Sequence, residues 1–111
     1  MKILITPNFL NQAKRLKKKF PDLKQDLLKV LKNFKPKNET HIGKSIYKLR
    51  INPTSTNKGK SGGLRLYTYL YKTNNLTVPI TIYSKSERES ISLNELEYHF
   101  EKTLKQIAQA L

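Results

Sequence analysis

The stretch KGKSGGLRLYTYLY, residues 58–71, places positive charge, glycine and aromatic rings side by side. Phosphate groups bind cations and free backbone N–H groups, and unstacked bases bind aromatic rings. Lys58 and Lys60 accompany glycines that let a backbone approach a phosphate closely. Arg65 and Tyr67 then alternate with apolar residues, as on a strand. These residue types in this order predict a surface that binds single-stranded RNA.

The glycines do not form a nucleotide-hydrolase phosphate loop. Such a loop needs the spacing GxxxxGK[ST] between a strand and a helix. Here Gly59-Lys60-Ser61 lacks the earlier glycine, and the residues after Gly63 alternate like a strand. Two interpretations remain open. The stretch is either a cationic hairpin loop that approaches a phosphate backbone, or a simple turn with solvated lysines.

A second predicted strand carries cations suited to the same surface. In SIYKLRI, Lys48 and Arg50 alternate with apolar positions. In the simplest register these two cations share one face with Arg65 and Tyr67, and Tyr83 lies close by. We therefore expect a functional role for the strand arginines.

The tyrosines of the strand also have a purely structural interpretation. The last helix must bury its apolar stripe, which consists of Leu93, Leu96, Phe100, Leu104, Ile107 and Leu111. Tyrosines beneath that helix are packing residues, and its glutamates are ion-pair partners for arginines. For Tyr69 and Tyr71 we expect this packing role.

Hydrophobic periodicity predicts the elements that position these residues, in the order β-α-α-β-β-β-α. A short strand precedes Thr6-Pro7, which begins a helix, and Pro21 separates that helix from a second one. Polar residues 35–44 predict a loop, and the capping-box pattern SLNE begins the last helix. The other predicted strands cover residues 45–51, 64–71 and 76–84; the last two form a hairpin around Asn74-Asn75, and Pro79 indicates an edge or a bulge.

This order predicts an α+β fold in one domain, residues 1–111. Its sheet is four-stranded and mostly antiparallel, with the N-terminal helical hairpin on one face and a C-terminal helix. The chain carries 22 Lys and Arg against 8 Asp and Glu, a net charge of +14. Nucleic acid is the commonest partner of so basic a domain, and an acidic protein is the next candidate.

The composition also limits the chemistry. The chain has no cysteine, which excludes disulfides, thiolate metal sites and cysteine nucleophiles. Its two histidines, His41 and His99, are far apart in sequence without an acidic cluster, so we expect surface histidines, no metal site and no cofactor. The apolar run near the start is too short for a signal peptide or a membrane span, which predicts a cytoplasmic protein.

The segments YKLRI, KGKSGGLRLYTY and ITIYSKSERE, preceded by a strand and a basic helical hairpin, resemble the RelE/ParE superfamily of bacterial toxins, and more narrowly its RelE-like and HigB-like members. The resemblance covers nearly the whole chain. It implies a toxin of a type II toxin–antitoxin system that a cognate antitoxin neutralises. Many RelE-like members cut messenger RNA in the ribosomal A site, whereas ParE-like members inhibit DNA gyrase.

The resemblance also implies roles for individual residues. RelE-like toxins cut RNA through attack of its own 2′-OH, with lysine, arginine and tyrosine in place of histidine pairs. Arg65 matches the arginine that stabilises the charged transition state, and Lys48 and Arg50 match the basic residues of the second strand. The implied catalytic set is Arg65, Lys48, Arg50, Lys85 and Tyr83, and the implied RNA-binding set is Lys58, Lys60, Tyr67 and Arg88.

The chain departs from the RNA-cutting members after its last strand. Those members place a further Arg or His there and a Tyr near the C-terminus, whereas this chain has Lys85, Ser86 and Arg88, with Tyr83 as a substitute tyrosine. The alternatives are therefore a weak ribonuclease, a gyrase inhibitor, and a decayed toxin that binds RNA without cutting it.

Overall fold

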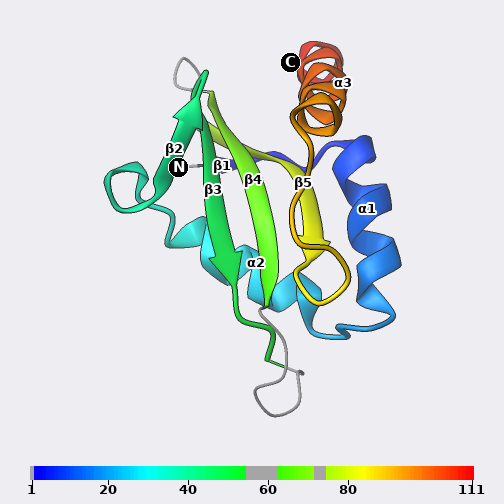
Figure 1. The fold of residues 1–111 in the computed structure, drawn as a ribbon. Helices are drawn as coiled ribbons and strands as arrows, with labels where there is room; N and C mark the ends of the chain where they lie inside the picture. Colours follow the sequence, from blue (N-terminus) through cyan, green and yellow to red (C-terminus); the bar gives the residue numbers. More distant parts are fainter. Residues whose placement is uncertain (1, 55–62, 72–74) are drawn as a thin grey trace.

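The computed structural model describes residues 2–54, 63–71 and 75–111. In this part of the chain, three α-helices and a short 3₁₀ helix accompany one sheet (Figure 1). No helix of the described residues has both the length and the apolar character needed to cross a membrane. The elements are β1 (Lys2–Ile3), α1 (Pro7–Lys17), α2 (Leu23–Lys32), η1 (Pro36–Asn38), β2 (Thr40–Gly43), β3 (Ile46–Ile51), β4 (Leu64–Tyr71), β5 (Leu76–Ser84) and α3 (Leu93–Ala110).

The described strands form a five-stranded sheet in the order β1-β5-β4-β3-β2. Strand β1 runs parallel to β5, and the other neighbours are antiparallel. The mixed α+β architecture and the mostly antiparallel sheet agree with the prediction from the sequence. The prediction of four strands was wrong, because β2 occupies part of the expected loop at residues 35–44.

Strand β2 was missed because it lies at the edge and carries no hydrophobic alternation. Three of its four residues are exposed, so the strand needs no buried apolar side chains. It pairs with β3 through His41 opposite Tyr47, whose rings stack with their centroids 4.8 Å apart. Lys44 and Ser45 connect the two strands and both have positive φ, at 52° and 63°. Such a turn matches the twist of a hairpin but usually contains Gly or Asn.

Helices α1 and α2 cover one side of the sheet, as expected. The hydroxyl of Thr6 accepts a hydrogen bond from the Phe9 N–H and caps α1 just before Pro7. The apolar stripes of both helices pack on alternate residues of β3 and β4, where the side chains of Leu49 and Leu66 are almost fully buried. This packing leaves the other residues of the same strands on the opposite side of the sheet.

Helix α3 lies on that opposite side, toward the β5 edge (Figure 1). Ser92 caps it by accepting a hydrogen bond from the Glu95 N–H, as the capping-box pattern predicts. Its buried stripe is narrower than expected and contains Leu96, Thr103 and Ile107, with Phe100 partly buried. The prediction was wrong for three leucines, which are 40–70% exposed: Leu93, Leu104 and Leu111.

Strand β5 contains the irregularity that Pro79 suggested. Its pairing with β4 shifts between Tyr67 opposite Thr81 and Thr68 opposite Pro79, so Ile80 is the additional residue of a bulge. Strand β1 ends before this bulge, and here the side chain of Gln12 from α1 forms the hydrogen bonds with β5 in its place. The Gln12 amide donates to the Ile80 carbonyl at 3.1 Å and accepts from the Thr81 hydroxyl at 2.6 Å.

Candidate functional site

Three neighbouring strands bring the predicted strand residues together. Across the sheet, Lys48 pairs with Tyr67, Arg50 pairs with Arg65, and Arg65 pairs in turn with Tyr83. All five side chains lie opposite the helical hairpin, on a surface that we call the basic face. In Figure 1, α2 lies behind the end of β3 and the start of β4, on the other side of the sheet, whereas α3 lies toward β5 and away from these strand ends.

The two arginines of the basic face stand directly opposite each other. Like charges at opposed positions of an antiparallel pair repel, and a nearby anion reduces that repulsion. Arg50 is exposed and Arg65 is half-buried, and the Arg65 Nη1 lies 3.4 Å from the Leu64 carbonyl that accepts from it. A pair of guanidinium groups in this arrangement can bind an anion such as a phosphate group.

Gly63 makes the arginine end of β4 possible. Its φ is +79°, and a Cβ placed there would lie 2.7 Å from the Ile51 carbonyl oxygen and 3.7 Å from the Arg65 Nη1. A side chain would therefore displace the backbone at the end of β3, while its contact with the Arg65 guanidinium would be an ordinary van der Waals contact. The glycine beside Arg65 serves close packing at the point where β3 and β4 meet.

The tyrosines form a stack between two cations. The rings of Tyr67 and Tyr83 lie nearly parallel, with centroids 6.5 Å apart. The Lys48 Nζ lies 5.9 Å from the Tyr67 centroid, and the Arg88 Cζ lies 5.5 Å from the Tyr83 centroid. Burial raises the pKa of the Tyr67 phenol, and the nearby Tyr83 hydroxyl raises it further. These contacts join the strand cations to the loop after β5.

Tyr83 differs from its partner in the stack because its hydroxyl is fully enclosed. The side chain is 5% exposed, and although the hydroxyl lies near enough to the Tyr67 phenol to raise the pKa of that phenol, no contact to it within the described residues has the geometry of a hydrogen bond. A buried polar group of this kind is uncommon and often marks a functional position. In this arrangement the ring is a packing surface and the hydroxyl does not face solvent.

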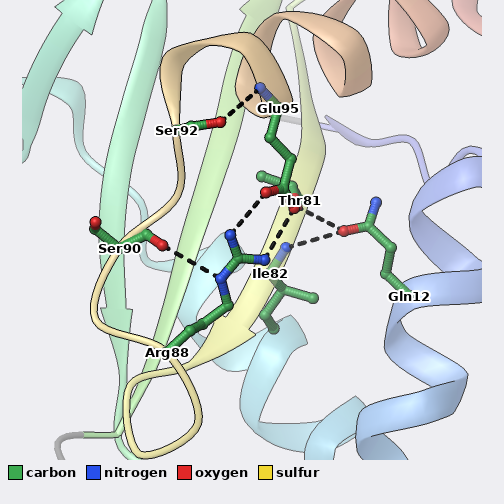
Figure 2. A network of polar contacts seen from close by, with 7 residues as sticks. All are labelled: Gln12, Thr81, Ile82, Arg88, Ser90, Ser92 and Glu95. Atoms are coloured by element: carbon green, nitrogen blue, oxygen red, sulfur yellow. Dashed lines mark hydrogen bonds and ion pairs between the residues drawn. The ribbon is translucent and has the colours of Figure 1, made fainter.

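The loop after β5 carries the last two predicted site residues, and both pair with glutamates. Arg88 binds Glu95 of α3 through both carboxylate oxygens, at 2.7 and 2.9 Å, and its Nε donates to the Ser90 carbonyl at 3.2 Å (Figure 2). This bidentate contact lowers the pKa of Glu95 and raises that of Arg88. The Lys85 Nζ lies 3.7 Å from a Glu89 carboxylate oxygen.

Two residues beside this loop were not predicted as site residues: Glu95, which the sequence suggested only as a possible partner of the strand arginines, and His99. With Gln12, Arg15 and Arg88 they line a groove of about 340 Å³ between α1, β5 and α3. The expectation of a surface histidine was wrong for His99, which is half-buried. Its Nδ1 accepts from the Asn8 side-chain amide at 3.0 Å, and burial lowers its pKa. The signal was its position three residues after Leu96, on the buried side of the helix.

The remaining predicted residues divide into two groups. Tyr69 and Tyr71 pack beneath α3, where the Tyr69 ring meets Phe100 edge-on at 5.2 Å, as expected. Lys58 and Lys60 lie outside the described residues. Nowhere in the described ranges do three residues that bind metals gather into a possible site.

Comparison with known proteins gives one informative result. No protein-family model and no curated protein matches the sequence. Among solved structures, the chain is similar to the Escherichia coli toxin RelE in the free state, in a mutant with two arginines replaced by alanine. The TM-score is 0.54, the sequence identity is 17%, and the match covers 96% of each chain. The fold is therefore RelE-like over almost its whole length.

Proposed function

From this RelE-like fold and its basic face, we propose that the chain is the toxin of a type II toxin–antitoxin system and an endoribonuclease that cuts messenger RNA at the ribosome. The opposed pair of Arg50 and Arg65 supports the proposal most directly, because two guanidinium groups at opposed positions can bind the same phosphate. The net charge of +14 adds attraction to RNA over a longer range.

The proposed reaction is the attack of a ribose 2′-oxygen on the adjacent phosphorus. The 2′-oxygen bond to phosphorus forms, the bond to the 5′-oxygen breaks, and the products are a 2′,3′-cyclic phosphate and a free 5′-hydroxyl. The 2′-OH loses a proton to a base, the 5′-oxygen gains one from an acid, and negative charge develops on the phosphorane oxygens.

The basic face supplies groups for each need. Arg65 offers two parallel donors to the phosphorane oxygens, and Arg50 holds a neighbouring phosphate. Lys48, whose Nζ lies over the Tyr67 ring, is the strand residue proposed to exchange a proton with the ribose. Lys85 adds positive charge, and the ring of Tyr83 packs against the ring of Tyr67. Lys58, Lys60 and Arg88 are the proposed RNA contacts. Tyr67, expected from the sequence to be a fourth, is only 6% exposed and lies beneath Lys48, so its proposed role is to support that lysine and not to stack on a base.

A neutralising antitoxin and a cytoplasmic site of action belong to the same proposal. A basic protein that cuts messenger RNA needs a partner that inhibits it until the protein is released. An acidic segment of that partner, bound across the basic face, would form ion pairs with its cations. Co-expression with the product of the neighbouring reading frame, followed by co-purification, tests this partner directly.

The decisive experiment replaces Arg65 and measures cleavage of messenger RNA on programmed ribosomes. Arg65→Lys keeps the charge but loses the paired donors, so binding persists while cleavage slows. The expected loss is about 2–4 kcal/mol of barrier, the range for removing one preorganised oxyanion donor. Arg65→Ala is expected to relieve growth arrest when the protein is expressed without an antitoxin.

Lys18→Ala is the matched control, because Lys18 is an exposed cation at the end of α1, a helix that packs on the other side of the sheet. It is expected to leave cleavage and growth arrest unchanged. A folded Arg65→Ala protein that still arrests growth would contradict the catalytic assignment. An assay of DNA gyrase inhibition and an assay of RNA binding without cleavage would then separate the two alternatives.

A further inference from the structure

Arg88 is the most fully engaged cation of the loop after β5. Three of its donors are used: Nε binds the Ser90 carbonyl, and the two terminal nitrogens bind the two oxygens of Glu95 (Figure 2). The backbone N–H of Glu95 donates to the Ser92 hydroxyl, which caps α3 and fixes the backbone of Glu95 at the start of the helix. The guanidinium is thus tied to α3 while the side chain stays partly exposed.

The same guanidinium lies at the margin of the basic face. Its Cζ is 5.5 Å from the centroid of Tyr83, which stacks on Tyr67, which in turn lies beneath Lys48. A small movement away from Glu95 would therefore bring Arg88 toward RNA bound over the basic face. In the present arrangement the carboxylate neutralises the charge that RNA would use.

The other acidic side chains of this loop have partners of their own. Glu87 binds Lys19 of the segment after α1 at 2.9 Å, and Glu89 lies near Lys85. Glu95 is the acidic partner that the structure gives to Arg88. Both side chains of that pair are more than a third exposed, at 40% for Arg88 and 36% for Glu95. Ion pairs with this exposure contribute little stability, so a phosphate group can displace the carboxylate.

We infer that Glu95 competes with RNA for Arg88. In the free protein the ion pair with α3 keeps this arginine from binding RNA, and in the complex a phosphate group displaces the carboxylate. This inference rests on the proposed RNA-binding function and adds to it a regulating residue on α3. It assigns Arg88 two alternative partners, Glu95 in the free protein and phosphate in the complex.

The experiment is a double-mutant cycle on RNA affinity. The probe is a short fluorescent single-stranded RNA with 2′-O-methyl groups, which cannot be cut by 2′-OH attack. Four proteins are compared: wild type, Glu95→Gln, Arg88→Gln and the double variant. Glu95→Gln keeps the backbone N–H that binds Ser92 and removes the competing charge. Glu97→Gln is the matched control, because Glu97 is exposed on the same helix and forms no ion pair within the described residues.

Glu95→Gln is expected to tighten binding about two- to five-fold, the range set by an exposed ion pair. The gain is expected to vanish when Arg88 is also replaced. In the Glu95→Gln background, loss of Arg88 is also expected to reduce the salt slope of affinity by about 0.7, the value for one phosphate contact on a single strand. Glu97→Gln is expected to change affinity much less.

Three results would overturn the inference. A gain that persists in the double variant, or an equal gain in Glu97→Gln, would show a general effect of net charge while leaving the proposed function intact. Weaker binding by folded Glu95→Gln would show that Glu95 holds Arg88 in its working position. Absence of RNA binding by the wild-type protein at low salt would overturn the proposed function, and this inference with it.

Discussion

Lys48, Arg50 and Arg65 reach the basic face from neighbouring strands, whereas Lys85 and Arg88 reach its margin from the loop after β5. We call these the strand part and the loop part of the candidate site. The strand part is positioned by backbone hydrogen bonds and by the alternation of side chains across a buried sheet. The loop part is positioned by side-chain contacts with glutamates, which are partly exposed.

The difference has a consequence for how each part responds to change. Moving a strand residue requires moving buried backbone, so the strand part is rigid and changes there affect folding. Moving a loop residue requires exchange of an exposed ion pair, which costs little. The strand part is therefore suited to hold a reacting phosphate, and the loop part is suited to respond to ligands.

The largest expected effect comes from breaking the strand part at Gly63. In Gly63→Ala the new Cβ meets the Ile51 carbonyl oxygen, and the residue must keep a φ of +79°. Strained backbone of this kind costs about 1–3 kcal/mol. Urea unfolding followed by circular dichroism is expected to show that loss in the free energy of unfolding.

The matched change in the loop part is Arg88→Gln. Loss of its exposed pair with Glu95 is expected to lower the free energy of unfolding by less than about 1 kcal/mol. If Arg88→Gln destabilises the protein as much as Gly63→Ala does, the distinction between a rigid and an exchangeable part is wrong.

The same distinction explains what sequence reasoning achieved. Alternation in KLR and LRLYTY is enforced by a core on the other side of the sheet, where Leu49 and Leu66 are buried. Since one face is strongly apolar, the shared face of Lys48, Arg50 and Arg65 could be predicted from the sequence alone. The capped starts of α1 and α3 were predictable for a similar reason, because the capping residues are local in sequence.

The loop part did not follow from the sequence, because its contacts join residues without periodic spacing. The pair of Arg88 and Glu95 depends on where α3 docks, and His99 depends on Asn8, which lies at the other end of the chain. Strand β2 was missed for a different reason: its side chains are exposed, so its residues carry no pattern. Tertiary contacts of polar residues leave little signal in one sequence.

A smaller effect is expected where the two parts meet, at Tyr83. Its buried hydroxyl has no partner within the described residues, and an unsatisfied buried group of this kind costs about 1–3 kcal/mol. Tyr83→Phe keeps the ring between Tyr67 and Arg88 and removes that cost. We expect the free energy of unfolding to rise by about 1 kcal/mol in the same urea experiment.

Tyr98→Phe makes the same chemical change at a side chain that is 56% exposed, and it is expected to leave stability unchanged. If Tyr83→Phe destabilises the protein, then the hydroxyl has a partner that stabilises the fold, and the two parts are joined more tightly than the ring stack suggests. Unchanged ribosomal cleavage by Tyr83→Phe would also remove the hydroxyl from the catalytic set.

The smallest expected effect concerns pH and the docking of α3, which carries Glu95. Burial lowers the pKa of His99 below its ordinary value of 6.5; nearby Lys102, Arg15 and Arg88 lower it further, and Glu95 opposes the shift. The folded protein therefore binds a proton at His99 less readily than the unfolded chain does. As pH falls below 6.5, the unfolded state gains that proton first, so the free energy of unfolding falls.

This loss is expected as pH falls below 6.5, and below the ordinary glutamate value of 4.5 the lowered pKa of Glu95 adds a second loss, as protonation of its carboxylate breaks the pair with Arg88. Urea unfolding at several pH values measures both. His99→Gln is expected to flatten the upper range and leave the lower one. If the pH dependence in the upper range is unchanged in His99→Gln, then protonation of His99 does not weaken the docking of α3 on α1. If Arg88→Gln abolishes the loss of stability below pH 4.5, that loss comes from the ion pair of the loop part. Without Arg88, Glu95 has no cation that lowers its pKa so strongly.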